Sequence, residues 1–160
     1  MPVCKFARAN FCQVFKGDAA YGYCATKKEY YYGFHGHIVI NSTGVITGGT
    51  FAAANIDERD VCPELLVGKI NGLLLGDKGF IRSILKQELT EHGTYLETPL
   101  RDNMSDERPK SFIKWLTSTR RLIETVIGQL SERFHIEKVR ARNLWHQASR
   151  FWRKLLAHTM

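Results

Sequence analysis

The sequence has no apolar run long enough to cross a membrane. The longest runs, Leu65–Val67 and Leu73–Leu75, are far shorter than the roughly 18 residues that a membrane-spanning helix requires. The first residues, Met1 to Lys5, also lack the basic start and apolar stretch of a secretory signal. We therefore expect a cytoplasmic protein with no membrane partner.

Cysteine is scarce and is not grouped for metal binding. The four cysteines, at positions 4, 12, 24 and 62, form no Cys-x-x-Cys pair, and no histidines stand at zinc-finger spacing. This pattern argues against a structural zinc site and, in a cytosolic chain, favours small buried thiols over disulfides. Internal repeats and low-complexity tracts are absent as well. With 44% hydrophobic residues, the 160-residue chain is expected to form a single domain over 1–160.

The positive charge of the chain is concentrated in its last part. The formal net charge is +7 at pH 7. Residues 1–100 carry ten Lys/Arg and ten Asp/Glu, whereas residues 101–160 carry thirteen Lys/Arg and six Asp/Glu. A localised basic surface attracts polyanions because Lys and Arg release the counterions condensed on phosphates. The excess indicates either a nucleic-acid partner or an ordinary solvated basic face.

Residue periodicity predicts alternating strands and helices. The expected strands are 30–40, 45–51, 73–76 and 94–98, and the expected helices are 57–70, 80–91, 112–134 and 144–158. The first two strands should form a hairpin through Asn41–Gly44, and the apolar strand at 73–76 should be buried on both faces. In the first helix, Asp60 is a possible N-cap and Pro63 falls in the first turn. This order predicts a mixed α/β sheet flanked by helices, then a basic helical C-terminal part at about 111–160.

Asp77 is the most suggestive single residue. It follows the apolar strand, which places a carboxylate at the carboxyl end of the sheet, where α/β folds bind ligands. Gly79 allows the chain to turn sharply away and leaves that carboxylate unobstructed. Capping of the helix that follows explains the same position without any chemistry, so both roles stay open.

Glu124 is the second acidic candidate. It lies at the margin of an apolar stripe in the helix at 112–134, formed by Leu116, Ile123, Ile127, Leu130 and Phe134. From there it can reach inward to the sheet edge, and Gly128, one turn later, leaves room for a metal ion or a phosphate. One turn earlier, Arg120 and Arg121 can contact a phosphate backbone or form an ordinary surface pair with Glu124.

Carboxylates from different elements can hold two divalent ions that activate a hydroxyl and stabilise the leaving oxygen of a phosphodiester. Oxygen ligands suit magnesium or manganese. Such a site usually has at least three carboxylates, so Asp77 and Glu124 are an incomplete set. Asp18 lies in a loop-like segment, whereas the acids of 57–60 are better explained by the positive start of a helix.

Two further groups of side chains have alternative interpretations. His35 and His37 alternate on a strand and so share a face, but no further ligand stands at a useful spacing for metal. Aromatic residues also recur among the basic residues of the C-terminal helices, at Trp115, Trp145, Phe151 and Trp152. They can form a stacking surface for bases, although helical spacing favours a place in the core.

Five phrases of the sequence together resemble one known family, the DDE transposases of bacterial insertion sequences, and most closely the insertion sequence 982 type. The phrases are Pro2–Lys5, Lys27–His37, Ala54–Val61, Leu75–Phe80 and Arg120–Thr125. Each phrase is weak by itself, but the five occur in the same order and cover the chain nearly end to end.

The resemblance implies a ribonuclease-H-like fold in which three carboxylates bind two Mg²⁺ (or Mn²⁺) ions. These ions serve to cut the element's ends and to join the freed 3′-hydroxyls to target DNA. Asp77 resembles the second carboxylate and Glu124 the third. The implied partners are terminal-repeat and target DNA and a possible second copy of the chain. The expected DNA contacts are Lys78, Arg120, Arg121, Lys138, Arg140 and Arg142.

The family's first aspartate lies on an opening strand, in a phrase resembling Asp-Ser-x-Pro-Val-x-Cys. This sequence matches that phrase only from Pro2 onward. We therefore expect a catalytic domain that is incomplete at its N-terminus, with unpaired strand edges, poor stability and no catalysis. Two alternatives stay open: a non-catalytic DNA-binding remnant, and a ribonuclease-H-like nuclease unrelated to transposition.

Overall fold

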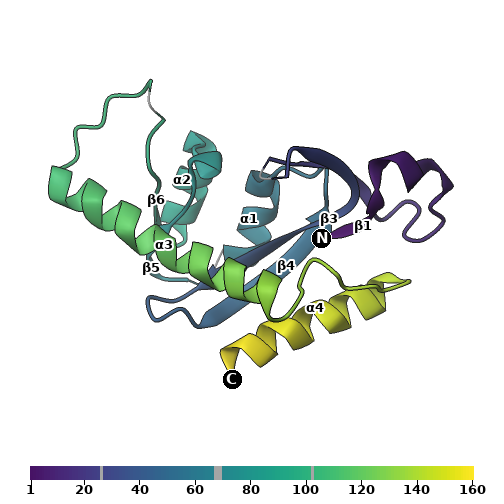
Figure 1. The fold of residues 1–160 in the computed structure, drawn as a ribbon. Helices are drawn as coiled ribbons and strands as arrows, with labels where there is room; N and C mark the ends of the chain where they lie inside the picture. The colour runs from purple at the N-terminus through teal and green to yellow at the C-terminus, as the bar shows by residue number, and fades with distance from the viewer. Residues whose placement is uncertain (26, 67–69, 102) are drawn as a thin grey trace. The chain divides into compact units, whose positions relative to one another are not determined.

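The computed structural model describes residues 1–25, 27–66, 70–101 and 103–160. Its elements follow one another along the chain as drawn in Figure 1: β1 (Pro2–Lys5), η1 (Phe6–Phe11), β2 (Ala20–Cys24), β3 (Glu29–Ile40), β4 (Ile46–Ala53), α1 (Glu58–Leu66), β5 (Gly72–Leu75), η2 (Lys78–Phe80), α2 (Ser83–Glu91), β6 (Thr94–Glu97), α3 (Lys110–Glu132) and α4 (Leu144–Thr159). The predicted mixed α/β composition is confirmed. The chain divides into two compact units, one formed by Met1–Ile56 with Val126–Met160 and the other by Asp57–Thr125.

The first unit is built on the predicted hairpin of β3 and β4. The two strands pair antiparallel from Phe34 with Ala53 to Ile40 with Ile46. Their turn is closed by one side chain, because Asn41 Oδ1 accepts hydrogen bonds from the backbone N–H groups of Thr43 and Val45, each at 3.0 Å. An asparagine that binds its own turn in this way makes the hairpin a local property of the sequence.

Two short strands that the sequence did not predict extend this sheet. β1 and β2 lie on opposite edges of the first half of β3, both antiparallel to it. The N-terminal amine of Met1 donates to the Phe34 carbonyl at 2.6 Å. Beyond Phe34, β4 is the one described strand that pairs with β3.

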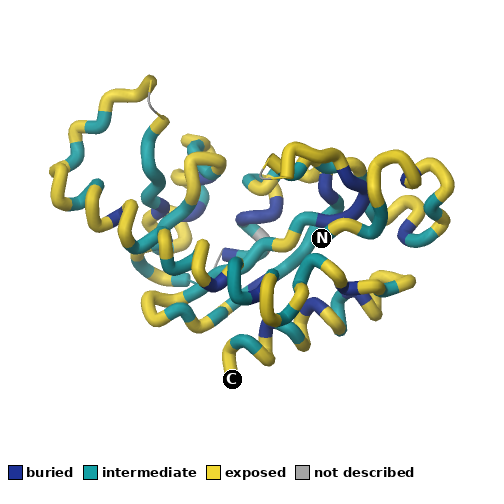
Figure 2. The backbone as a smooth tube through the Cα atoms, viewed as in Figure 1, coloured by how far each residue is buried: buried dark blue, intermediate teal, exposed yellow. Residues whose placement is uncertain are grey.

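The core of the first unit lies between this sheet and the two C-terminal helical segments. Its buried centre consists of Val126, Leu130, Phe151 and Leu155. Close packing depends on Gly49, because a Cβ at that position would lie 2.7 Å from Leu155 Cδ1. Figure 2 shows the resulting alternation of buried and exposed positions along α4. Phe151 is 1% exposed, as the core interpretation predicted, whereas Trp115, Trp145 and Trp152 are 43%, 72% and 43% exposed, and for these three that interpretation is wrong.

The second unit contains a two-stranded parallel sheet. β5 and β6 pair in register from Gly72 with Thr94 to Leu75 with Glu97. Leu73 is 51% exposed, so the prediction of a strand buried on both faces is wrong. Its register partner Tyr95 is 57% exposed as well, whereas Thr94 and Leu96 are buried, so this sheet is covered on one face and open on the face of Leu73. α2 packs against this sheet through Leu85 and Leu89, both buried.

Helix boundaries account for most of the remaining differences. α1 begins at Glu58, and the side chain of Asp57 just before it accepts a hydrogen bond from the Arg59 N–H at 2.9 Å. Asp60 is therefore in the first turn and not at the N-cap, and Pro63 lies inside the helix. The predicted continuation over 67–69 lies outside the described residues. In the predicted helix at 80–91, Phe80 belongs to the preceding 3-10 turn η2 and the α-helix begins at Ser83.

The apolar stripe of α3 is shifted by one residue from the predicted one. Leu116 and Leu130 are buried as expected, but the third buried position is Val126, and Ile127 is 48% exposed. Spacings of 10 and 4 residues keep these three side chains on one side of a helix with 3.6 residues per turn. No helix in the described parts of the chain meets the length and apolarity that a membrane crossing demands.

Three cysteines are intermediate in burial and Cys62 is buried, so the prediction of buried thiols holds for Cys62 alone, and all four are free. Burial and the nearby Glu88 raise the pKa of the Cys62 thiol to about 11.

Candidate functional site

Asp77 lies just beyond the carboxyl end of β5. The pairing with β6 continues for one residue past the strand, since the Gly76 N–H donates to the Glu97 carbonyl at 2.9 Å. Asp77 then caps the short turn η2, because its Oδ1 accepts from the Lys78 N–H at 2.6 Å. Its side chain is 63% exposed. The observed cap thus belongs to the 3-10 turn η2 and not to the following helix, whose N-cap is Arg82, and it leaves the Asp77 carboxylate accessible.

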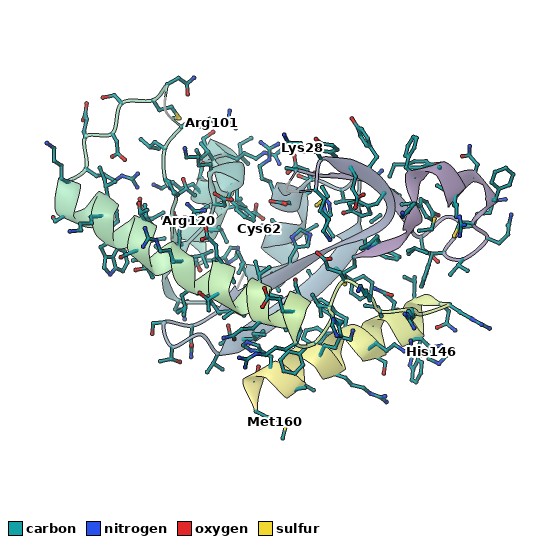
Figure 3. All side chains as sticks on the ribbon, viewed as in Figure 1. Lys28, Cys62, Arg101, Arg120, His146 and Met160 are labelled. Atoms are coloured by element: carbon teal, nitrogen blue, oxygen red, sulfur yellow. The ribbon has the colours of Figure 1, made fainter. Side chains whose placement is uncertain are left out.

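Arg120 approaches the same carboxylate oxygen from α3. Its Nη2 lies 2.8 Å from Asp77 Oδ1, and the Arg120 side chain is 22% exposed. The sequence suggested a surface pair of Arg120, labelled in Figure 3, with Glu124, but the partner of Arg120 is Asp77. This contact fixes one side of α3 at the end of β5, within the second unit.

Glu124 is exposed and lies one helical turn after Arg120. Residues four apart in a helix lie on the same face. The face of α3 that carries Glu124 is therefore the face that contacts Asp77. No hydrogen bond or ion pair of the Glu124 carboxylate occurs among the described residues, so its oxygens face solvent.

Glu58, at the start of α1, is a further carboxylate beside Asp77. Its Oε2 lies 3.4 Å from the position that a Cβ on Gly79 would take. The pKa of the Glu58 carboxyl is raised, first by partial burial and then by the negative charges of Asp77 and Asp57. The sequence assigned Glu58 to the helix N-terminus alone, and no local signal could have indicated its approach to Asp77, because 19 positions separate the two residues.

The donor set at this edge suits a hard divalent cation. Asp77, Glu58 and Glu124 offer carboxylate oxygens, the ligands that Mg²⁺ and Mn²⁺ prefer. After burial, the negative charges of Asp77 and Asp57 contribute to the raised pKa of Glu58, so these carboxylates interact with one another. Nevertheless, within the described part of the chain no three acidic, histidine or cysteine side chains converge closely enough to hold a metal ion.

The predicted DNA-contact residues fall into two groups. The first group lies in the second unit and consists of Lys78, Arg120 and Arg121. Lys78 follows Asp77 directly, and the two arginines lie one helical turn before Glu124. Lys78 is not free of contacts in the structure. Lys138, Arg140 and Arg142 lie in the first unit, in the irregular segment between α3 and α4.

The segment between α3 and α4 forms a basic surface pocket of about 580 Å³, lined by Arg140, Ala141, Arg142, Asn143, His146 and Arg150. Arg150 donates from Nη1 to the carbonyls of Val139 and Arg140 at 2.7 and 2.9 Å, which holds the segment against α4. The sequence did not indicate His146 or Arg150, because their approach depends on how the segment folds back.

His35 and His37 share one face of β3, as expected from strand alternation. His35 Nδ1 and His37 Nε2 are buried and have no hydrogen-bond partner among the residues that the structure describes. Burial lowers the pKa of both imidazoles. The positive charge of the N-terminal amine lowers the pKa of His35 further, and His35 does the same for His37. Asp18 lies far from these residues in sequence, in the turn after Phe15, where its N–H donates to the Phe15 carbonyl.

Taken together, the fold and the site define an α/β protein with acidic side chains near a strand end in the second unit and a basic pocket in the first. Comparison with known families gives the assignment: the family described as "Transposase DDE domain" matches residues 1–144. The chain therefore belongs to the DDE transposase domain family, whose function is related to DNA transposition and whose members generally bind DNA and use divalent metal ions. No curated protein and no solved structure matches the chain.

Proposed function

We propose that this chain takes part in the DNA cutting and joining of an insertion-sequence transposase of the 982 type, with Asp77 and Glu124 as two of its metal-binding catalytic carboxylates. The observation that carries the proposal is the contact of Arg120 with Asp77, which brings the Glu124 face of α3 to the end of β5. A match to the transposase family over residues 1–144 supports it independently.

Each residue has a definite task in this proposal. Asp77 and Glu124 hold one or two Mg²⁺ or Mn²⁺ ions, which when bound activate a hydroxyl and stabilise the departing oxygen. Lys78, Arg120 and Arg121 bind the phosphates next to the scissile bond. Glu58 raises the negative charge around Asp77 and so favours a cation there.

The basic pocket supports DNA binding at a second place. Arg140, Arg142 and Arg150 present guanidinium groups around one hollow, and guanidinium pairs well with phosphate oxygens. We infer that this pocket binds the backbone of terminal-repeat or target DNA, with Lys138 next to it in sequence. A second copy of the chain is a further expected partner, because cutting and joining act on two DNA ends.

The proposed fold is ribonuclease-H-like. An antiparallel hairpin, β3–β4, is followed by alternating helices and strands in which β5 and β6 are parallel. Each sheet keeps an edge that no described strand covers, so each can accept a further strand. We propose that the chain alone is catalytically inactive, since the described residues bring no third metal-binding carboxylate into one cluster with Asp77 and Glu124.

Metal binding tests the roles of the two carboxylates directly. The purified chain is titrated with Mn²⁺ and the free ion is followed by electron paramagnetic resonance. Asp77→Asn and Glu124→Gln should each weaken Mn²⁺ binding by about tenfold or more. A loss of about tenfold is typical even for residues that only support a metal ligand. Glu132→Gln, an exposed acid further along α3, is the matched control. Unchanged binding in both site variants would contradict the proposed site.

A strand-transfer assay with Mg²⁺ and terminal-repeat DNA tests the proposed lack of activity. We expect no joined product above a Glu124→Ala control, and product above that control would overturn the proposal of inactivity. Hydrolysis without joining would favour a nuclease. DNA binding that survives Asp77→Ala and Glu124→Ala, with no Mn²⁺ binding, would favour a non-catalytic DNA-binding protein.

A further inference from the structure

The sheet formed by β2 and the first half of β3 carries tyrosines on one face. The antiparallel register places Tyr21 opposite Tyr32 and Tyr23 opposite Tyr30. Directly opposed residues of an antiparallel pair point to the same side of the sheet. All four tyrosines therefore share a face.

The other face of this small sheet is packed against the chain. A Cβ at Gly22 would lie 2.7 Å from Ala54 Cβ and 3.2 Å from the Tyr31 ring. Tyr31 is 8% exposed. One side of the sheet is filled in this way. On the tyrosine side Tyr32 is buried too, at 9% exposed, so the exposed part of that side is the part that carries Tyr21, Tyr23 and Tyr30.

Three of these tyrosines and one phenylalanine form a continuous exposed aromatic surface, here called the tyrosine face: Phe6, Tyr21, Tyr23 and Tyr30. Neighbouring ring centroids lie 4.9 Å apart for Tyr23–Tyr30, 5.8 Å for Phe6–Tyr30 and 5.4 Å for Phe6–Tyr21. The rings meet at interplanar angles of 51 to 59°, so they do not cover one another's flat sides. Their residues are 44 to 61% exposed.

Two exposed cations lie on segments next to the tyrosine face. Arg8 lies in η1 with Phe6, and Lys28, labelled in Figure 3, lies in the turn between β2 and β3. Lys5 is opposed to Tyr31 and so belongs to the packed side of the sheet. Residues 1–32 contain five Lys/Arg and two Asp/Glu. The overall balance of residues 1–100 hides this local excess, which is why charge counting along the sequence indicated the C-terminal part alone.

Exposed aromatic rings bordered by cations fit a flexible polyanion that carries flat bases. In single-stranded DNA the bases are free to stack on protein rings while Lys and Arg follow the phosphates. In a duplex the flat sides of the bases are already stacked on each other. We propose that the tyrosine face binds single-stranded DNA, with bases on Phe6, Tyr21, Tyr23 and Tyr30 and phosphates on Arg8 and Lys28. This site uses neither Asp77 nor Glu124 and needs no metal.

Fluorescence anisotropy with the full chain in EDTA tests the proposal apart from the metal site. The probes are a labelled oligothymidine of about 12 nucleotides, an abasic oligomer of the same length and a duplex of the same length. The chain should bind the oligothymidine about fivefold or more tighter than the abasic oligomer, the effect of at least one base stack. Lys28→Gln should weaken binding of both single strands alike.

Substitution of one ring then locates the stacking site. Tyr30→Leu should reduce oligothymidine binding and leave abasic binding unchanged, whereas Tyr30→Trp should retain it. Tyr95→Leu is the control, because Tyr95 is 57% exposed on β6, in the second unit. Far-UV circular dichroism checks that the variants are folded.

Three results would overturn the proposal. One is equal affinity of the wild-type chain for oligothymidine and the abasic oligomer, a comparison that stands even if Tyr30→Leu fails to fold. Another is an equal loss in Tyr30→Leu and Tyr95→Leu. The third is the absence of single-strand binding, which would leave the tyrosine face as a docking surface for protein.

Discussion

The guanidinium Nη2 of Arg120 lies 2.8 Å from Asp77 Oδ1, although 43 positions separate the two residues in the sequence. The same oxygen accepts the Lys78 N–H. A cation that binds Asp77 through this oxygen therefore competes with Arg120 for it. In the proposed site, Arg120 is released from Asp77 as the cation binds and becomes available to a phosphate.

Replacement of Arg120 should for this reason strengthen metal binding. Arg120→Gln removes the competing charge, and we expect Mn²⁺ to bind several-fold more tightly in the paramagnetic-resonance titration. The free energy of unfolding should change by less than about 1 kcal/mol, because ion pairs near the surface contribute little. Arg121→Gln, next to it on α3, is the control. Weaker Mn²⁺ binding in Arg120→Gln would show that Arg120 orients Asp77 and does not compete for it.

The basic pocket should contribute to DNA binding through charge. Arg142→Gln is expected to weaken binding of duplex DNA to a similar extent for unrelated sequences and to reduce the slope of log affinity against log salt by about 1. Anisotropy titrations at several salt concentrations measure both. Gln87→Ala, a neutral substitution on α2, provides the comparison for an uncharged surface change. An unchanged salt slope in Arg142→Gln would remove this residue from the DNA interface.

The half-buried histidines of β3 should make the fold sensitive to acid. Burial lowers the pKa of His35 and His37 in the folded chain, so the folded state holds fewer protons than the unfolded state. Stability is then fully present above the ordinary histidine pKa of about 6.5 and falls as the pH drops below it. Urea unfolding at pH 8 and pH 5.5 should show this loss, and His37→Gln should reduce it.

The exposed His92→Gln is the matched control for the acid effect. If the loss of stability between pH 8 and pH 5.5 is as large in His37→Gln as in His92→Gln, burial of His37 is not its cause.

Replacement of glycine by alanine should have opposite effects on stability at Gly33 and at Gly128. A Cβ at Gly33 would lie 2.4 Å from the Met1 carbonyl oxygen and 2.9 Å from Val3 N, so Gly33→Ala should cost about 1–3 kcal/mol, as overpacking does. A Cβ at Gly128 in α3 would meet no atom within 4 Å, and Gly128→Ala should stabilise the helix by about 1 kcal/mol. Thermal melts of both variants measure the difference. A gain in Gly33→Ala would mean that β1 is not held against β3.

Features that depend on neighbours in the chain could be predicted from the sequence. The β3–β4 hairpin follows from β-branched and aromatic residues on either side of an asparagine that binds its own turn. The position of Asp77 follows in the same way, because an apolar run that ends at Gly76 places the next side chain at a strand end. Turns and strand alternation depend on residues that are close together in the sequence, so the mixed α/β order was predicted correctly.

Features that depend on distant packing were decided by the tertiary structure alone. Helical spacing predicted an ion pair of Arg120 with Glu124, but Arg120 pairs with Asp77 at the end of β5. Glu58 approaches the same edge from another helix. Likewise, the residues of 30–40 predicted a strand but those of β2 did not, and only the packing of the fold determined that Tyr21, Tyr23 and Tyr30 are exposed while Tyr32 is buried. A sequence specifies which faces an element has, and long-range packing determines what each face meets.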